Sequence, residues 1–403
     1  MKKILSVIFV AFAVIVIIFS LSEFFLYQQN SFFIIRFLEI KGILRNDFPN
    51  ILILISFCLF MVCLITKNLK AFIVNIIFLL IAISVVWRYV SANNIIAKQY
   101  AFIDHGTKKA YQGSDVLGWV AVKNSIDSSS RYYGNNLIYK TVYSFDEKGL
   151  RKTPAIIRTN FTRSIGFFGC SFAFGSGLAD SMALPYIIQT SLNNKFKAYN
   201  FALPGYGTQH MLYMIDHNII DSIITISPSV FIYIAIPDHV KRILGHYQYC
   251  NNFPRYVLDP QLKEPKLEGY FKVNKESDNK ITNFIDQYFI KRIRSADIEL
   301  FALMVNNSKK LLMKKYPDCE FHVLLWDVVR PDNENATFGK LMEKYLIQYH
   351  IKTHLISNII PDYVKNISNY TIKYPIDCHP NYKINKMLAN YIVKEIIDHR
   401  AQQ

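Results

Sequence analysis

The sequence predicts an α/β fold with a parallel sheet in its C-terminal part, and two observations support this prediction. From residue 163 onward, apolar runs of strand length alternate with segments of helical periodicity, which is typical of helices packed on both faces of a parallel sheet. The first ninety residues differ, because long stretches of them are almost wholly apolar. We therefore expect a membrane region at 1–90, a linker and β-rich segment at 91–160, and the α/β domain at 161–403.

The elements of the α/β domain follow from apolar periodicity and from the residues that punctuate it. The expected strands are Ile165–Phe168, Ala198–Phe201, Val230–Ala235, Phe321–Leu325 and Thr353–Ile356. The expected helices are Leu184–Leu192, Thr208–His217, Ile298–Tyr316 and Asn385–His399. Between His246 and Lys280 the chain is polar and aperiodic, which favours a long connection that is either a lid or binding loop or an idle insertion.

Three apolar runs predict about three transmembrane helices in the first ninety residues: Ile4–Tyr27, Ile51–Thr66 and Ala71–Trp87. The first is long enough to cross a hydrocarbon core of roughly 30 Å. The lysines at positions 2, 3, 67 and 70 favour the cytoplasmic side. With an odd number of spans, the C-terminal domain is then expected on the extracytoplasmic side, periplasmic or extracellular, of an integral membrane protein.

Charge and cysteine content narrow the possible partners. The formal net charge of +16 favours contact with anionic membrane lipid or an acidic surface polymer. No dense Lys/Arg cluster with interleaved aromatics marks a nucleic-acid groove, so nucleic acid is not an expected partner. No Cys-x-x-Cys pair or Cys/His cluster has zinc-site spacing, so neither a metal site nor a cofactor is expected.

Two segments far apart in the sequence carry residues suited to nucleophilic catalysis. The run Gly169-Cys170-Ser171-Phe172 follows a predicted strand and places Ser171 on a tight turn at the carboxyl edge of the sheet, where ligands bind in open α/β sheets. The run Asp377-Cys378-His379-Pro380-Asn381 precedes the last predicted helix. A histidine so placed can take the serine proton, while the carboxylate holds the imidazole in the required tautomer.

A third segment, Asn200-Phe201-Ala202-Leu203-Pro204-Gly205, again ends a strand in a glycine turn. Taken together, the three segments resemble the SGNH/GDSL-type hydrolases, a family of esterases and acyl-transfer enzymes. The resemblance covers roughly Arg163 to the C-terminus and implies a flavodoxin-like three-layer α/β/α domain. It implies Ser171 as nucleophile, Gly205 as an oxyanion donor, and Asp377 and His379 as the remaining members of a triad.

Three departures from the family pattern stand out. Cys170 occupies a position where the family often has Asp, and one residue instead of two separates Asp377 from His379. The family's third block supplies an Asn side chain to the oxyanion hole, but here the strand is followed by Ile236-Pro237-Asp238-His239. Asp238 and His239 are the oxyanion or substrate-binding candidates at that position.

The function expected from these residues is serine-dependent hydrolysis or transfer of an acetyl-type acyl ester on a cell-envelope glycan or lipid, by a membrane-anchored enzyme. The alternative is a non-catalytic glycan-binding or assembly protein with a degraded site. Because Cys170 and Cys378 each adjoin a proposed catalytic residue, a disulfide between them is a further hypothesis.

Overall fold

The structure is a computed structural model that describes residues 102–106, 110–154, 161–193, 195–272, 293–330 and 333–398. These residues belong to one compact unit, Ala97–Gln403. The three predicted transmembrane helices fall within residues 1–90 and therefore outside the described ranges. Among the described helices, none has the length and apolar character needed to cross a bilayer.

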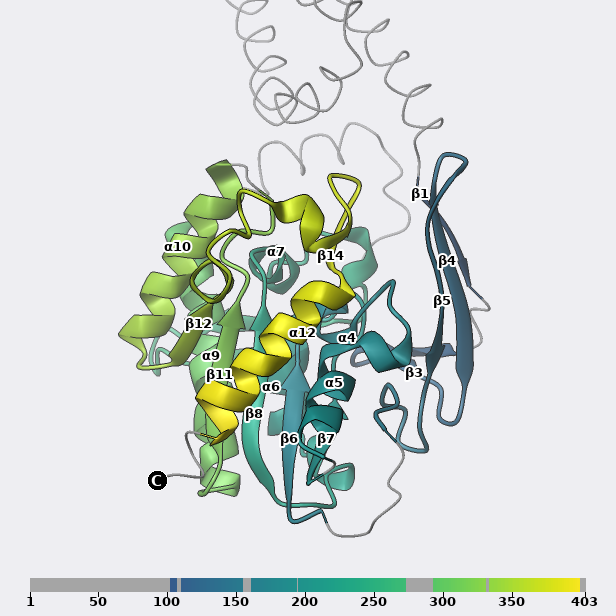
Figure 1. Ribbon diagram of the computed structural model, residues 1–403. Helices are drawn as coiled ribbons and strands as arrows, with labels where there is room; N and C mark the ends of the chain where they lie inside the picture. The colour runs from purple at the N-terminus through teal and green to yellow at the C-terminus, as the bar shows by residue number, and fades with distance from the viewer. Residues whose placement is uncertain are drawn as a thin grey trace, which may run out of the picture. The chain divides into compact units, whose positions relative to one another are not determined.

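A five-stranded parallel sheet forms the centre of the α/β domain (Figure 1). Its strands are β6 (Arg163–Phe168), β7 (Phe196–Asn200), β8 (Pro228–Ala235), β11 (Glu320–Leu325) and β12 (Lys352–Leu355). They lie in the order β12-β11-β8-β6-β7, which is the 2-1-3-4-5 order of flavodoxin-like sheets. All five predicted strands are confirmed, and their ends agree to within two residues.

Helices cover the two faces of this sheet. Helix α5 (Leu184–Ser191) packs against α12 (Tyr382–Tyr391), which continues as a π-helical segment, Ile392–Asp398. Helices α6 (Thr208–Asp216), α7 (Asp238–Ile243) and α9 (Ser295–Lys315) pack against one another, and α10 (Asn333–Gln348) lies beside α9 and β12. In Figure 1, α5 and α12 lie in front of the sheet and α9 behind it. The four predicted helices are confirmed, whereas α7 and α10 were not predicted.

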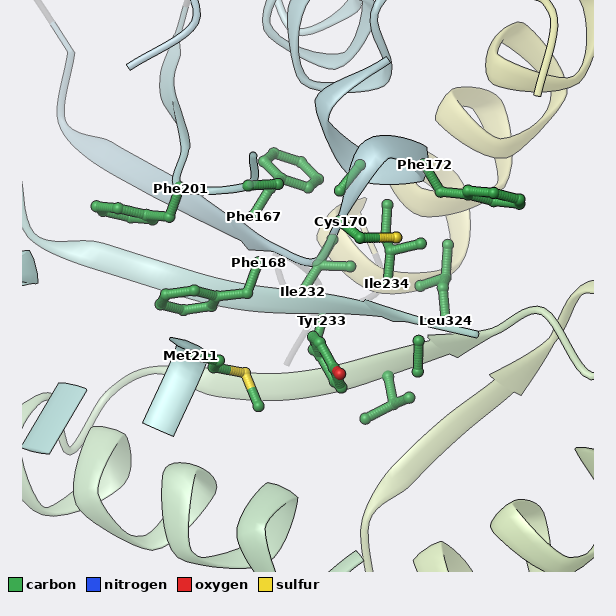
Figure 2. Close-up of a cluster of buried hydrophobic side chains, with 14 of the residues drawn as sticks. Phe167, Phe168, Cys170, Phe172, Phe201, Met211, Ile232, Tyr233, Ile234 and Leu324 are labelled. Atoms are coloured by element: carbon green, nitrogen blue, oxygen red, sulfur yellow. The ribbon is translucent and has the colours of Figure 1, made fainter. Parts of the chain in front are cut away.

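The core explains why the strands were recognisable in the sequence. All eight residues of β8 are buried, as expected for a central strand covered on both faces. Aromatic rings from the strands and from the residues that follow them pack together in this core (Figure 2). The ring of Phe168 on β6, for example, stacks on that of Phe201 after β7, with centroids 5.1 Å apart. This packing fixes the carboxyl ends of the strands, which carry the candidate site.

The segment before the α/β domain is rich in strands, as predicted. Strands β1 (Phe102–Gly106), β4 (Ile126–Tyr133) and β5 (Asn136–Ser144) form an antiparallel sheet, and β2 (Tyr111–Ser114) pairs with β3 (Gly118–Ala121). The described residues between 102 and 154 are called the β-rich segment.

The buried side chain of Arg151 joins the β-rich segment to the α/β domain. Its guanidinium donates hydrogen bonds to the backbone carbonyls of Phe174, Gly175 and Leu178, at 2.5–2.7 Å, and pairs with Asp180 at 3.0 Å. The turn that follows the proposed nucleophile is therefore held from the β-rich segment.

The long connection expected between His246 and Lys280 contains regular structure in its described part, which was not predicted. Strands β9 (Pro254–Leu258) and β10 (Pro265–Tyr270) form an antiparallel hairpin there. Exposed residues alternate with buried or partly buried ones along these strands. Such a hairpin carries a weaker apolar signal than the fully buried strands of the central sheet.

Candidate active site

The proposed nucleophile, Ser171, begins the one-turn helix α4 (Ser171–Phe174), directly after β6. The turn between them requires Gly169, whose φ is +148°; a Cβ there would lie 2.9 Å from the Cβ of Ala173 and from the carbonyl oxygen of Ile234. A side chain at this position would therefore clash with both neighbours. The glycine thus lets the chain reverse sharply and place the serine hydroxyl at the carboxyl edge of the sheet.

His379 and Asp377 lie on the short strand β14 (Asp377–Pro380), which pairs with β13 (Thr371–Lys373). A short helix, α11 (Ile356–Ile359), starts directly after β12 and comes before this pair in the chain. The loop after His379 is fixed by Asn381, which caps α12 and donates to the carbonyls of Asn369 and Thr371. The Asp-Cys-His-Pro-Asn run therefore combines the four residues of β14 with a helix cap.

The structure brings the three predicted triad residues together. His379 Nε2 lies 2.8 Å from Ser171 Oγ, and His379 Nδ1 lies 2.6 Å from Asp377 Oδ1. The same carboxylate oxygen accepts the backbone N–H of His379 at 2.9 Å. One intervening residue is thus enough for the carboxylate to contact both the ring and the backbone of the histidine.

The environment of Asp377 keeps its carboxyl ionised. Burial alone would raise its pKa, but hydrogen bonds from His379, the charge of that ring and the charge of Arg131 together lower it to about 2. Arg131 comes from β4; its Nη1 lies 3.4 Å from Asp377 Oδ2, while Nε and Nη2 contact Asp104 at 2.6 and 2.8 Å. An ionised Asp377 can orient His379 and stabilise its imidazolium form.

Gly205 lies in the turn between β7 and α6, with a φ of +86°. A Cβ at this position would be 2.6 Å from the indole of Trp119, a residue of β3. The hydroxyl of Tyr206 donates to the Trp119 carbonyl at 2.6 Å, which fixes the turn against the β-rich segment. Ser171 and Gly205 line the same cleft.

The two candidates that follow β8 differ in position. Asp238 lines the cleft with Ser171. His239 is fully buried and its Nδ1 lies 2.5 Å from the hydroxyl of Tyr233. Burial and the Arg242 charge hold the pKa of His239 well below its ordinary value, so the ring is neutral. The expectation that His239 contacts substrate is therefore corrected, because its ring faces the interior of the domain.

The cleft around Ser171 has a volume of about 950 Å³ and two walls. The α/β domain supplies one wall and the β-rich segment the other, with residues from β1 to β5. Aromatic side chains are prominent among the lining residues: Tyr111, Trp119, Tyr139, Tyr143, Phe172, Tyr247 and Tyr249. Charged side chains lie between them: Asp104, Asp127, Arg131, Asp238, Lys241, Arg242 and Arg330. The β-rich segment is therefore part of the site.

The cysteines do not support the disulfide hypothesis. Cys170 and Cys378 are both buried, and neither forms a disulfide. Figure 2 shows the Cys170 side chain among apolar residues of the sheet. The thiol thus fills core space beneath the nucleophile turn instead of forming a cross-link.

Three residues of the site were not found from the sequence: Arg131, Trp119 and Arg242. The first two lie in the β-rich segment, where the sequence indicated only short strands joined by polar turns. The third follows the β8 turn on a helix that was not predicted. Within the described ranges, no group of three or more His, Cys, Asp or Glu side chains is placed to hold a metal ion.

Comparison with known proteins adds structural likeness at low identity. No family model and no curated protein matches the sequence. Among solved structures, the chain is similar to LAE5, an alpha/beta hydrolase enzyme from the metagenome of Lake Arreo, Spain: identity is 9%, coverage 57% of this chain and 93% of that one, and TM-score 0.36.

It is also similar to an acetyl xylan esterase, Est2A, from Butyrivibrio proteoclasticus, with 11% identity, coverage of 70% and 73%, and a TM-score of 0.35. A putative lipolytic protein of G-D-S-L family from Desulfitobacterium hafniense matches with 12% identity, coverage of 57% and 96%, and a TM-score of 0.33. With all three TM-scores below 0.5, the functional argument rests on the geometry of the site.

Proposed function

We propose that this protein is a serine-dependent esterase or acyl-transfer enzyme of the SGNH/GDSL type. The observation that carries this proposal is the continuous hydrogen-bond chain from Ser171 Oγ through His379 to Asp377. A serine hydroxyl is a weak nucleophile until a neighbouring base accepts its proton, and here the base is in contact with the hydroxyl. Ser171, at one end of this hydrogen-bond chain, lines a cleft large enough for an ester substrate.

The reaction follows from this geometry. Ser171 Oγ attacks the ester carbonyl carbon while its proton passes to His379 Nε2, and the carbonyl π electrons move to oxygen. Asp377 stabilises the imidazolium that forms. His379 then gives the proton to the departing alkoxide, which leaves an acyl-enzyme. Water or a sugar hydroxyl resolves this acyl-enzyme by the reverse sequence, so hydrolysis and transfer use the same residues.

An acylated cell-envelope glycan or lipid is the substrate class that we propose. Two features support it. The cleft combines aromatic faces with charged and hydroxyl groups, a lining suited to sugar rings, which present both apolar and polar surfaces. In addition, the apolar runs in the first ninety residues favour an enzyme anchored in a membrane with its α/β domain on the extracytoplasmic side.

This location predicts that a phosphatase fused after Gln403 is active. Activity of a cytoplasmic reporter alone at the same position would contradict it.

Turnover of p-nitrophenyl acetate tests the activity. We expect Ser171→Ala and His379→Ala each to lower kcat by about 10³-fold or more, because either change removes the activated nucleophile. His217→Ala is the matched control, since this half-exposed ring stacks on Tyr213 and lies outside the cleft. Equal losses in the His379 and His217 variants would contradict the assignment.

The missing amide in the third block favours a second candidate, a glycan-binding or assembly protein without catalysis. A folded wild-type protein that binds an acylated oligosaccharide but turns over neither this ester nor p-nitrophenyl acetate would support that candidate instead.

A further inference from the structure

The segment after β8 provides no side-chain N–H donor for an oxyanion at this site. After β8, Pro237 has no backbone N–H, and Asp238, when ionised, offers only acceptor oxygens. His239 faces the interior. None of these three residues can therefore supply the side-chain N–H that an asparagine would provide, and a negatively charged oxygen in the cleft would rely on other groups.

Arg242 lies one helical turn further along α7 and lines the same cleft as Ser171 and Gly205. Only 6% of the residue is exposed. Its Nη1 donates to the carbonyl of Tyr206 at 2.5 Å, and its Nε donates to the hydroxyl of Tyr249 at 3.3 Å. These two contacts hold the guanidinium plane directly beside the Gly205 turn.

The guanidinium also interacts with the side chain of Cys170, and no hydrogen bond from its remaining nitrogen, Nη2, to an oxygen is found among the described residues. The charge is permanent: burial alone would lower the pKa of Arg242, but neighbouring groups, including Cys170, Tyr249 and Asp238, raise it above its ordinary value. Cys170 precedes the nucleophile and Tyr206 follows Gly205. The guanidinium therefore contacts both the segment that carries the nucleophile and the turn that carries Gly205.

We propose that Arg242 takes the place of the missing amide and donates, through Nη2, to the oxyanion that forms when Ser171 attacks the substrate carbonyl. This inference rests on the proposed acyl-transfer function and adds a catalytic residue to it. The donor is charged and shielded from solvent, and such donors stabilise developing negative charge more strongly than exposed ones. The same contacts that hold the Gly205 turn orient this donor before substrate binds.

Three variants test the proposal: Arg242→Ala, Arg242→Lys and the control Arg255→Gln. Arg242→Ala should lower kcat for p-nitrophenyl acetate by about 10²-fold or more, with little change in KM, because the donor acts on the transition state. Millimolar guanidinium should restore part of the lost rate. Arg242→Lys retains the buried charge and replaces the alanine variant in the test if that variant does not fold. It should also show a lower kcat with little change in KM. Arg255, an exposed residue paired with Glu268, should have no effect.

Binding of an arylboronic acid gives a readout independent of turnover, because its tetrahedral adduct with Ser171 places an oxygen at the oxyanion position. Its Kd should rise in the Arg242 variants by about the same factor as kcat/KM falls.

A folded Arg242→Ala enzyme with wild-type kcat and boronate affinity would overturn the proposal while leaving the esterase function intact. A loss caused by Lys241→Gln, and not by the Arg242 variants, would overturn it as well. If the wild-type protein neither turns over ester nor binds boronate, the proposed function itself fails, and the role of Arg242 fails with it.

Discussion

At the scale of single residues, the catalytic role of Asp377 has a measurable counterpart in stability. Its side chain is 1% exposed and bonded to His379, and its pKa falls from the ordinary 3.8 to about 2. A carboxyl whose pKa is depressed by folding stabilises the protein above the pKa of the unfolded chain, and this stabilisation is lost as pH falls through the folded pKa.

We therefore expect stability from Asp377 to be fully present above about pH 4 and to be lost by about pH 2, with a magnitude of about 2 kcal/mol. Urea unfolding of the wild type and of Asp377→Asn across this range measures it. The difference between the two proteins should shrink as pH falls. Parallel stability curves over the whole range would contradict the predicted ionisation.

At the scale of elements, strand β4 contributes Arg131 to a triad whose three members lie on α4 and β14. Arg131 and Asp104 are directly opposite in the β1–β4 pairing, and their ion pair holds the guanidinium against Asp377. His379 and Arg131 are the charged partners of this carboxylate, and Asp104 on β1 and Tyr139 on β5 contact Arg131. Arg131 is a positioning residue, since it acts on the reaction through Asp377.

Replacing Arg131 with Gln should lower kcat/KM by about 10-fold through a less precisely held carboxylate. Without the arginine charge, the pKa of Asp377 rises. The acid limb of the pH–rate profile should therefore move to higher pH, and Arg131→Lys should restore most of its position. A drop in stability with an unshifted pH profile would assign Arg131 a structural role only.

At the scale of the whole molecule, the β-rich segment and the α/β domain are joined through the buried Arg151. Breaking a buried ion pair leaves uncompensated polar groups, and here four acceptors around the nucleophile turn would lose their donor. Arg151→Met should therefore cost about 3–5 kcal/mol in the free energy of unfolding.

The exposed pair of Arg255 and Glu268 gives the control for this change, because Arg255→Met should cost about 1 kcal/mol or less. Urea unfolding at neutral pH compares the two variants. Losses of similar size would mean that the Arg151 contacts do not hold the two regions together.

The elements and site residues that could be predicted from the sequence are those determined by the residues close to them in the chain. Strands such as β8 were visible because burial on both faces requires a continuous apolar run, and Ser171 and His379 were visible because they interrupt such patterns at element ends. Helix α10 and the β9–β10 hairpin were missed, since partly exposed elements carry weaker apolar periodicity. Arg131 was not predictable from the sequence, because its role depends on a contact with a residue 246 positions away.

Covalent labelling tests the central claim most directly: a fluorophosphonate should react with the one hydroxyl that His379 activates. Peptide mass spectrometry of the labelled wild-type protein is expected to show the phosphonyl group on Ser171, with labelling abolished in Ser171→Ala and strongly slowed in His379→Ala. Folded wild-type protein that stays unlabelled, or that carries the adduct on a different residue, would contradict the account.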